Sequence, residues 1–161
     1  MKRVILPFLL ALLLLPAANV AAQEGFTFMS FNLGHGFGIF LDDTSASDDI
    51  ESITTFGIDF RIADPLIVGF SRHTVSEGAV DFNVNLLNIK FDVMPMVRPV
   101  ISIGQGDGEP MTGLGFEIIP FRRSVGDLFT ELKLVPHYLF WPADGIGDGI
   151  FTISLMLGIG F

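Results

Sequence analysis

Four residues that together could hydrolyse an ester lie close in the sequence: Ser71, His73, Ser76 and Glu77. A serine hydrolase needs a serine, a histidine and an acid within hydrogen-bond reach of one another. If this stretch is extended, Ser71 and His73 share one face, whereas Ser76 points to the opposite one. The spacing therefore favours ordinary polar residues at a strand end, and we predict no catalytic residues.

Metal ligation is the second chemistry that the residue types allow. The three histidines, His35, His73 and His137, show neither HxH nor HxxxH spacing, and the chain contains no cysteine. The acidic segment 42–51 does not have the spacing of a twelve-residue calcium loop. Without a recognisable ligand spacing, the sequence predicts no metal site and no cofactor.

The segments that carry these residues are built on alternation, and the last one shows it best. From Phe151 to Phe161 every second residue is large and apolar, and the residues between them are Thr, Ser, Met and Gly. Successive side chains of a strand point to opposite faces. The segment is therefore predicted to be a strand with one bulky apolar face, and it includes the last residue of the chain.

The same alternation recurs along the chain. In 80–93 its phase changes at Leu86 and Leu87, which predicts a β-bulge and places Asp81, Asn83 and Asn85 on the polar face. The pattern predicts an all-β protein, a single antiparallel up-and-down barrel of about eight strands. The predicted strands cover 26–41, 53–63, 66–73, 80–93, 97–104, 111–121, 128–141 and 150–161.

The composition of the two faces decides which one lies inside. The exterior of a soluble barrel is rich in solvating charged side chains, whereas here the polar face consists mostly of Gly, Ser, Thr and Asn, and only 17% of the chain is charged. The bulky face is rich in Phe, Leu and Ile, as contact with lipid requires. A closed barrel is the one way in which strands can cross a bilayer with every backbone group paired. We therefore predict a transmembrane barrel rather than a soluble one.

Strand parity directs a set of charged residues into the lumen. Isolated charges there are costly, whereas mutually paired ones are tolerated. Since the interior of an eight-stranded barrel is just wide enough to be filled by side chains, we expect these charges to pair and fill it. The residues of this predicted lumen charge network are Asp59, Arg61, Asp81, Arg98, Glu117, Glu131 and Lys133.

Polar and aromatic residues on the apolar face suggest where the membrane ends. His35 lies between two glycines on this face, and a glycine bulge would turn it inward. Arg72, near an outer strand end, is placed to meet lipid phosphates. An aromatic girdle at the same height is predicted from Tyr138, Phe140 and Trp141.

The end of the chain carries a resemblance to a known group of proteins. Terminal Phe161, with apolar Ile159, Leu157 and Leu155 at every second position before it, resembles the C-terminal signal of outer-membrane barrels. The size and strand count are similar to those of the small eight-stranded barrels, the OmpA transmembrane domain and OmpX among them. The resemblance implies an outer-membrane location and recognition of Leu155, Leu157, Ile159 and Phe161 by the barrel-assembly machinery.

The first residues have the features of an export signal. Basic Lys2 and Arg3 precede an apolar run to Leu15, and small residues end at Ala22. This pattern predicts a signal peptide over 1–22, cleaved near Ala22 after Sec-type export, and a barrel domain over 23–161. The formal net charge of −9 argues against a nucleic-acid partner. The expected surroundings are outer-membrane lipids, and the expected state is a monomer.

The sequence leads to one functional hypothesis with two alternatives. The first is an integral outer-membrane barrel with a filled lumen and a structural or surface-interaction role. The second is a narrow channel or a transporter of small hydrophobic compounds. The third is an outer-membrane lipid-modifying enzyme, although the His–X–Ser–Asn motif of the lipid A deacylases is absent around His73.

Overall fold

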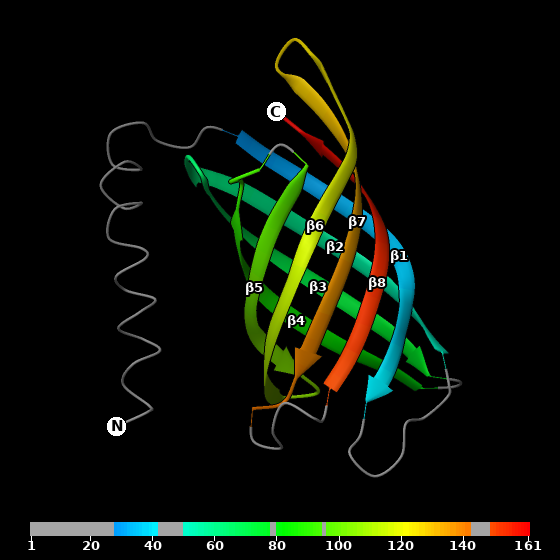
Figure 1. Cartoon of the computed structure of the whole chain (residues 1–161). Helices are drawn as coiled ribbons and strands as arrows, with labels where there is room; N and C mark the ends of the chain where they lie inside the picture. Colours follow the sequence, from blue (N-terminus) through cyan, green and yellow to red (C-terminus); the bar gives the residue numbers. More distant parts are fainter. Residues whose placement is uncertain (1–27, 42–49, 78–79, 95, 143–148) are drawn as a thin grey trace, which may run out of the picture.

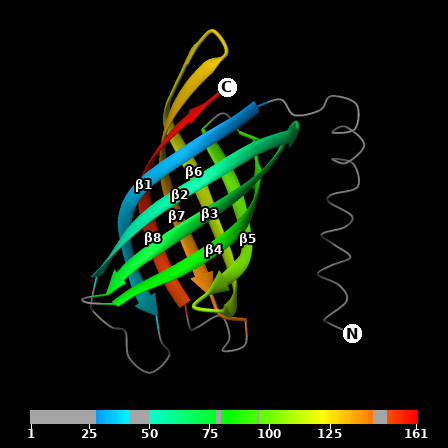
Figure 2. The same cartoon turned by 180° about the vertical axis from the view of Figure 1, so that it is seen from behind.

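The chain forms a closed eight-stranded antiparallel β-barrel in the computed structural model, which describes residues 28–41, 50–77, 80–94, 96–142 and 149–161 (Figures 1 and 2). Each strand pairs with its neighbours in the chain, and β1 pairs with β8. The fold class predicted from alternation is confirmed. The strands are β1 Phe28–Leu41, β2 Ile50–Ala63, β3 Leu66–Glu77, β4 Val80–Phe91, β5 Val97–Gly106, β6 Glu109–Val125, β7 Leu128–Phe140 and β8 Gly149–Gly160.

The two ends of the chain close the barrel. The ladder of β1 and β8 runs from Ser30 opposite Gly160 to Leu41 opposite Gly149. Beyond it, the amide of Met29 donates to the carbonyl of Phe161 at 2.9 Å, and the amide of Phe161 donates back at 3.0 Å. Phe161 is therefore part of the closing seam.

We call the end of the barrel that carries Phe28 and Phe161 the inner end, and the opposite one the outer end. The β6–β7 hairpin projects beyond the other strands at the inner end (Figures 1 and 2). At the outer end, β5 and β6 are joined by Asp107 and Gly108, both with positive φ, as a tight hairpin turn requires. The predicted signal peptide lies outside the described residues, as does most of the acidic segment 42–51.

The side chains sort by face as a membrane barrel requires. On β1 the outward-facing Leu33 and Phe37 are 62% and 61% exposed, whereas the inward-facing Ser30 and Asn32 are 1% and 3% exposed. Large apolar residues point outward on all eight strands, from Ile50 and Phe56 on β2 around to Leu155 on β8. This distribution is the reverse of a soluble barrel, whose apolar side chains lie inside.

Strand β4 corrects one prediction. Its register with β3 runs without a break from Val80 to Phe91, so there is no bulge at Leu86 and Leu87. Val84 and Leu86 are buried inside the barrel, and Asp81 is exposed outside, where it accepts a hydrogen bond from Ser76 at 2.9 Å. The assignment of Asp81 to the lumen was wrong because alternation gives two faces but not which one is buried, and near the outer end apolar residues pack inward.

The register changes occur at two other places. One lies between Arg61 and Ala63, beside the β2–β3 turn. The other lies in β6 between Ile118 and Phe121, where Pro120 has no amide hydrogen to give to the ladder. Strands β5 and β6 also extend past the bounds predicted for them. Strand β1 is regular throughout, so the predicted glycine bulge at His35 is wrong and the ring stays outward.

Candidate functional site

Six charged side chains meet inside the barrel in its inner half. They come from five strands: β2, β4, β5 and β6 contribute one residue each, and β7 contributes two. Three are cationic and three are anionic, so their formal charges cancel. None is more than 6% exposed; the six residues of this lumen charge network are Asp59, Lys90, Arg98, Glu117, Glu131 and Lys133.

Each cation of the network has more than one carboxylate partner. The Nζ of Lys90 lies 2.8 Å from Asp59 and 2.5 Å from Glu117. Arg98 donates from Nη1 and Nη2 to the two carboxylate oxygens of Glu131, at 3.0 and 2.8 Å. This two-pronged pairing is the strongest geometry that arginine and a carboxylate can form.

Lys133 lies between all three anions. Its Nζ is 3.5 Å from Asp59, 3.6 Å from Glu117 and 3.4 Å from Glu131. It also donates to the side-chain oxygen of Asn32 on β1 at 2.8 Å. The network thereby links strands on opposite sides of the lumen, and it meets the condition that buried charges be paired.

Two glycines make room for these side chains. A Cβ at Gly69 would lie 2.1 Å from Oδ1 of Asp59, and one at Gly158 would lie 2.7 Å from Oδ1 of Asn32 and 3.2 Å from Cε of Lys133. Any other residue at either position would displace a member of the network. The small inward residues of the sequence pattern therefore leave the space that the large charged side chains fill.

Further ion pairs extend the network to the inner end. Asp92, just after β4, accepts from Nε of Arg98 at 3.0 Å and pairs with Arg61. Arg61 also pairs with Asp64, and Arg122 donates from Nε to Glu131 at 2.6 Å. Burial on its own would raise the pKa of Asp92, but hydrogen bonds from Arg61 and Arg98 outweigh it and lower that pKa below its usual value.

A layer of neutral polar side chains lies next to the network on its outer side. Ser102 donates to Asn88 at 2.6 Å and lies 3.2 Å from Nε2 of His137. Asn88 donates in turn to Ser71 at 2.8 Å. The rings of His73 and His137 are neighbours, with centroids 6.2 Å apart and planes tilted by 59°.

Apolar side chains occupy the lumen at the outer end. Phe82 packs against them and contacts Phe40 and Trp141, with ring centroids 6.4 and 6.1 Å apart. Along its axis the interior therefore changes from charged to neutral polar to mainly apolar, with one buried acid, Glu51 of β2, at the outer end. The buried members of this apolar cap are Val84, Leu86, Met111, Leu139 and Ile150.

Comparison with known proteins agrees with this architecture. No family model and no curated protein matches the chain. The attachment invasion locus protein Ail of Yersinia pestis has the same fold, with a TM-score of 0.55 and 12% sequence identity, over 83% of this chain and 98% of Ail. The fold is that of a small outer-membrane barrel.

Two further solved structures also match this barrel. Neisserial surface protein A gives a TM-score of 0.47 at 11% identity, over 85% of this chain and 98% of its own. A de novo designed transmembrane β-barrel gives 0.48 at 11% identity, over 83% and 95%. The likeness to Ail confirms the predicted resemblance to small eight-stranded barrels at the level of the fold.

Most of the predicted lumen residues come together in this barrel. Asp59, Arg98, Glu117, Glu131 and Lys133 lie in the network, and Arg61 joins at the inner end through its pair with Asp92. The remaining predicted member, Asp81, lies outside, as described above.

The sequence interpretation missed Lys90, Asp92 and the network's amide, Asn32. A signal for Lys90 was present, because it falls between Ile89 and Phe91, which both point outward. The same signal was present for Asp92, which falls between Phe91 and Val93 in the predicted strand 80–93.

Of the histidines considered for hydrolysis and metal binding, His73 lies inside the barrel and His35 lies on its outer wall. His73 lies 3.0 Å from Thr55 and 3.1 Å from Ser71, but within the described residues no carboxylate bonds to it. His35 faces outward beside Phe37, with ring centroids 6.2 Å apart. In the described part of the chain, no three His, Asp or Glu side chains are grouped as a metal site would need.

The predicted girdle is only partly aligned on the outside of the barrel. The rings of Tyr138 and Phe140 stack on the outer wall with centroids 5.8 Å apart. Trp141 instead packs against the apolar cap, because it has the inward parity of Leu139. Its assignment to the girdle was wrong. The described residues form no helix that is long and apolar enough to span a membrane.

Proposed function

We propose that this protein is an integral outer-membrane barrel with a sealed lumen, which acts as a structural or surface-interaction protein and not as a pore. In this proposal residues 1–22 are a signal peptide cleaved near Ala22, and 23–161 form the barrel. The outer end faces the exterior, and the chain termini lie on the periplasmic side, as in bacterial barrels with an even number of strands.

The layered interior carries this proposal. An open path would have to pass the charge network, the neutral layer around Ser102 and Asn88, and the apolar cap. The cations of the network are held between carboxylates at 2.5–3.6 Å, so freeing one would leave a buried charge unpaired. Water-filled channels belong to barrels with many more strands. The interior therefore favours a sealed barrel over the narrow-channel alternative.

A surface role follows from what remains available for contact. With the lumen sealed, a partner on the outer side of the membrane can contact the outer loops, and a partner within the membrane can contact the lipid-facing wall. The name of Ail, an attachment invasion locus protein, describes a role of this kind for a barrel of the same fold. A lipid-modifying enzyme has less support, because the hydrogen bonds of His73 lead to hydroxyl groups and not to an acid.

The proposal includes the route of assembly. Leu155, Leu157, Ile159 and Phe161 all point outward and are 54%, 49%, 48% and 55% exposed, so an assembly factor could read them as one apolar stripe. Their strand β8 is also the closing strand. Tyr138 and Phe140 serve in this proposal as the outer aromatic girdle, without Trp141.

Fractionation and solute flux together test the proposal. The protein should fractionate with the outer membrane, and its unboiled form should migrate faster on cold gels than its boiled form. Proteoliposomes containing the refolded barrel should swell in isotonic arabinose no faster than empty liposomes, with a porin as the positive control. Swelling above the empty-liposome rate would overturn the sealed lumen, and recovery in the soluble periplasmic fraction would overturn the membrane location.

A further inference from the structure

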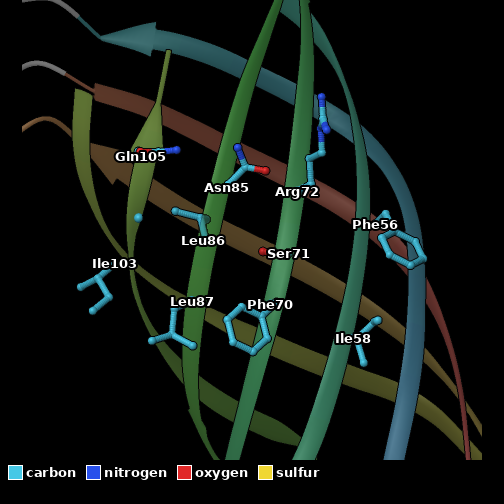
Figure 3. Close-up of a pocket in the computed structure, with 11 residues that line it drawn as sticks. Phe56, Ile58, Phe70, Ser71, Arg72, Asn85, Leu86, Leu87, Ile103 and Gln105 are labelled. Carbon is cyan, nitrogen blue, oxygen red and sulfur yellow. The ribbon is translucent and has the colours of Figure 1, made fainter. Parts of the chain in front are cut away.

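A groove of about 560 Å³ lies on the outside of the barrel wall, over β2 to β5 (Figure 3). Its outward-facing side chains form two rows that follow the register of the sheet. The apolar row consists of Ile58, Phe70, Leu87 and Ile103, each opposite the next. The polar row consists of Arg72, Asn85 and Gln105, again each opposite the next.

The polar row lies two residues nearer the outer strand ends than the apolar row. Figure 3 shows Arg72, Asn85 and Gln105 above Phe70, Leu87 and Ile103. On β2, the apolar Phe56 is opposite Arg72 and ends the polar row. Beyond the polar row, the next outward pair of β3 and β4 is Thr74 and Asn83, which is also polar. The groove therefore spans a change from an apolar to a polar wall, which is where an amphiphile places its headgroup.

Arg72 supplies the charge of this groove. The other arginines and lysines in the described parts of β1 to β5 point inward, and no salt bridge within the described residues reaches Arg72. Its Nε and Nη2 donate to Oδ1 of Asn83 at 3.3 and 3.0 Å, and Thr74 donates to the same oxygen at 3.0 Å. These contacts position the guanidinium and use one hydrogen each of Nε and Nη2, so Nη1 and the second hydrogen of Nη2 form a fork toward an anion.

We propose that this groove binds a phosphorylated, multiply acylated glycolipid of the outer leaflet. Its phosphate is paired with Arg72, and its acyl chains lie along the apolar row. Arginine is suited to phosphate because its planar fork donates two parallel hydrogen bonds. The orientation of the groove toward the outer leaflet rests on the function proposed above.

The width of the rows favours a glycolipid over a two-chain phospholipid. The apolar row crosses four strands and therefore spans about 14 Å, which holds several acyl chains side by side. The polar row crosses three strands, about 10 Å, and the amides of Asn85 and Gln105 can bond to hydroxyl and amide groups across that width. A phosphorylated sugar carrying several acyl chains offers both.

Native mass spectrometry of the refolded full-length barrel tests the proposal, with diphosphoryl lipid A as the probe. Wild-type barrel should retain lipid A, and R72Q should weaken its apparent Kd about tenfold. R123Q removes an exposed arginine of the inner hairpin and should leave the affinity unchanged. L87W should block the apolar row, whereas L155W, on the other side of the barrel, should not.

Three outcomes would overturn the proposal. They are equal retention by wild type and R72Q, equal retention of lipid A and its dephosphorylated form, and equal competition by phosphatidylglycerol. Cold-gel mobility of each variant shows that the barrel is folded. Because binding is measured in micelles, it can fail while the protein still fractionates with the outer membrane, and so the two proposals are tested separately.

Discussion

Arg98 on β5 and Glu131 on β7 form a two-pronged ion pair inside the barrel, at 2.8 and 3.0 Å, with both residues 1% exposed. The strand between them, β6, contributes Glu117 to the same cluster at 3.4 Å from Arg98. A guanidinium shared by two carboxylates ties three neighbouring strands together from within. It therefore acts on stability and on lumen closure at once.

Replacing Arg98 with Met should destabilise the folded barrel by about 3–5 kcal/mol, because Glu131 and Glu117 would lose a buried partner. Urea titration in detergent micelles, followed by the mobility of unboiled protein on gels, measures this difference. Arg123→Met is the matched control, since Arg123 is exposed on the β6–β7 hairpin. Equal midpoints for the two variants would contradict the network's role.

The unbroken register of β4 predicts that a new charge costs much stability at Leu86 and almost none at its neighbour Asn85. Leu86→Asp places a charge in the apolar cap and should cost about 3–5 kcal/mol, the range expected when a buried charge lacks a partner. Asn85→Asp is on the outer face and should stay within about 0.5 kcal/mol of wild type. The same urea titration compares the two variants. A larger loss of stability for Asn85→Asp than for Leu86→Asp would support the bulge at Leu86 and Leu87 instead.

Leu155 tests whether lipid contacts the outer wall. It lies near the middle of β8 and is opposite His35 of β1. Leu155→Arg should cost about 2–4 kcal/mol in lipid bilayers, the range for a cation on the lipid face near the midplane. Val125→Arg, on the projecting inner hairpin, should change little. If both variants behave alike, the wall faces water.

Phe161 allows assembly to be separated from stability. Phe161→Ala keeps the two backbone hydrogen bonds to Met29 but removes the terminal ring. We expect several-fold less barrel in the outer membrane, measured by quantitative immunoblotting, while purified variant refolds in detergent as wild type does. Phe161→Tyr should retain wild-type abundance. Wild-type abundance of Phe161→Ala in the outer membrane would refute the recognition of this residue by an assembly factor.

Strand alternation was enough to predict the barrel, because a period of two is a local property of the chain. On β1 the outward and inward residues from Met29 to Leu41 are placed as predicted, except that His35 stays outward. On β4 the same pattern misled, since Val84 and Leu86 look like lipid-facing residues but pack against Met111 and Leu139 inside. Whether the apolar face points inward or outward depends on the position along the barrel axis, and local alternation does not show that position.

The sequence predicted that charged residues pair inside the lumen, but it did not predict all the residues that take part. Parity gave Asp59, Glu117 and Lys133 their direction. The partners depend on how far each strand is staggered against the next, and this stagger is given by the pairing registers of all eight strands. The groove beside Arg72 was even less accessible to sequence reasoning, because its rows join residues of four strands.

Single-channel recording of the refolded barrel in planar bilayers tests the sealed lumen most directly. At 1 M KCl the protein should give no unitary current steps above the bare bilayer, over voltages at which a porin control conducts. Insertion should be verified on the same sample by cold-gel mobility. Reproducible steps of uniform size from folded wild-type protein would contradict the account.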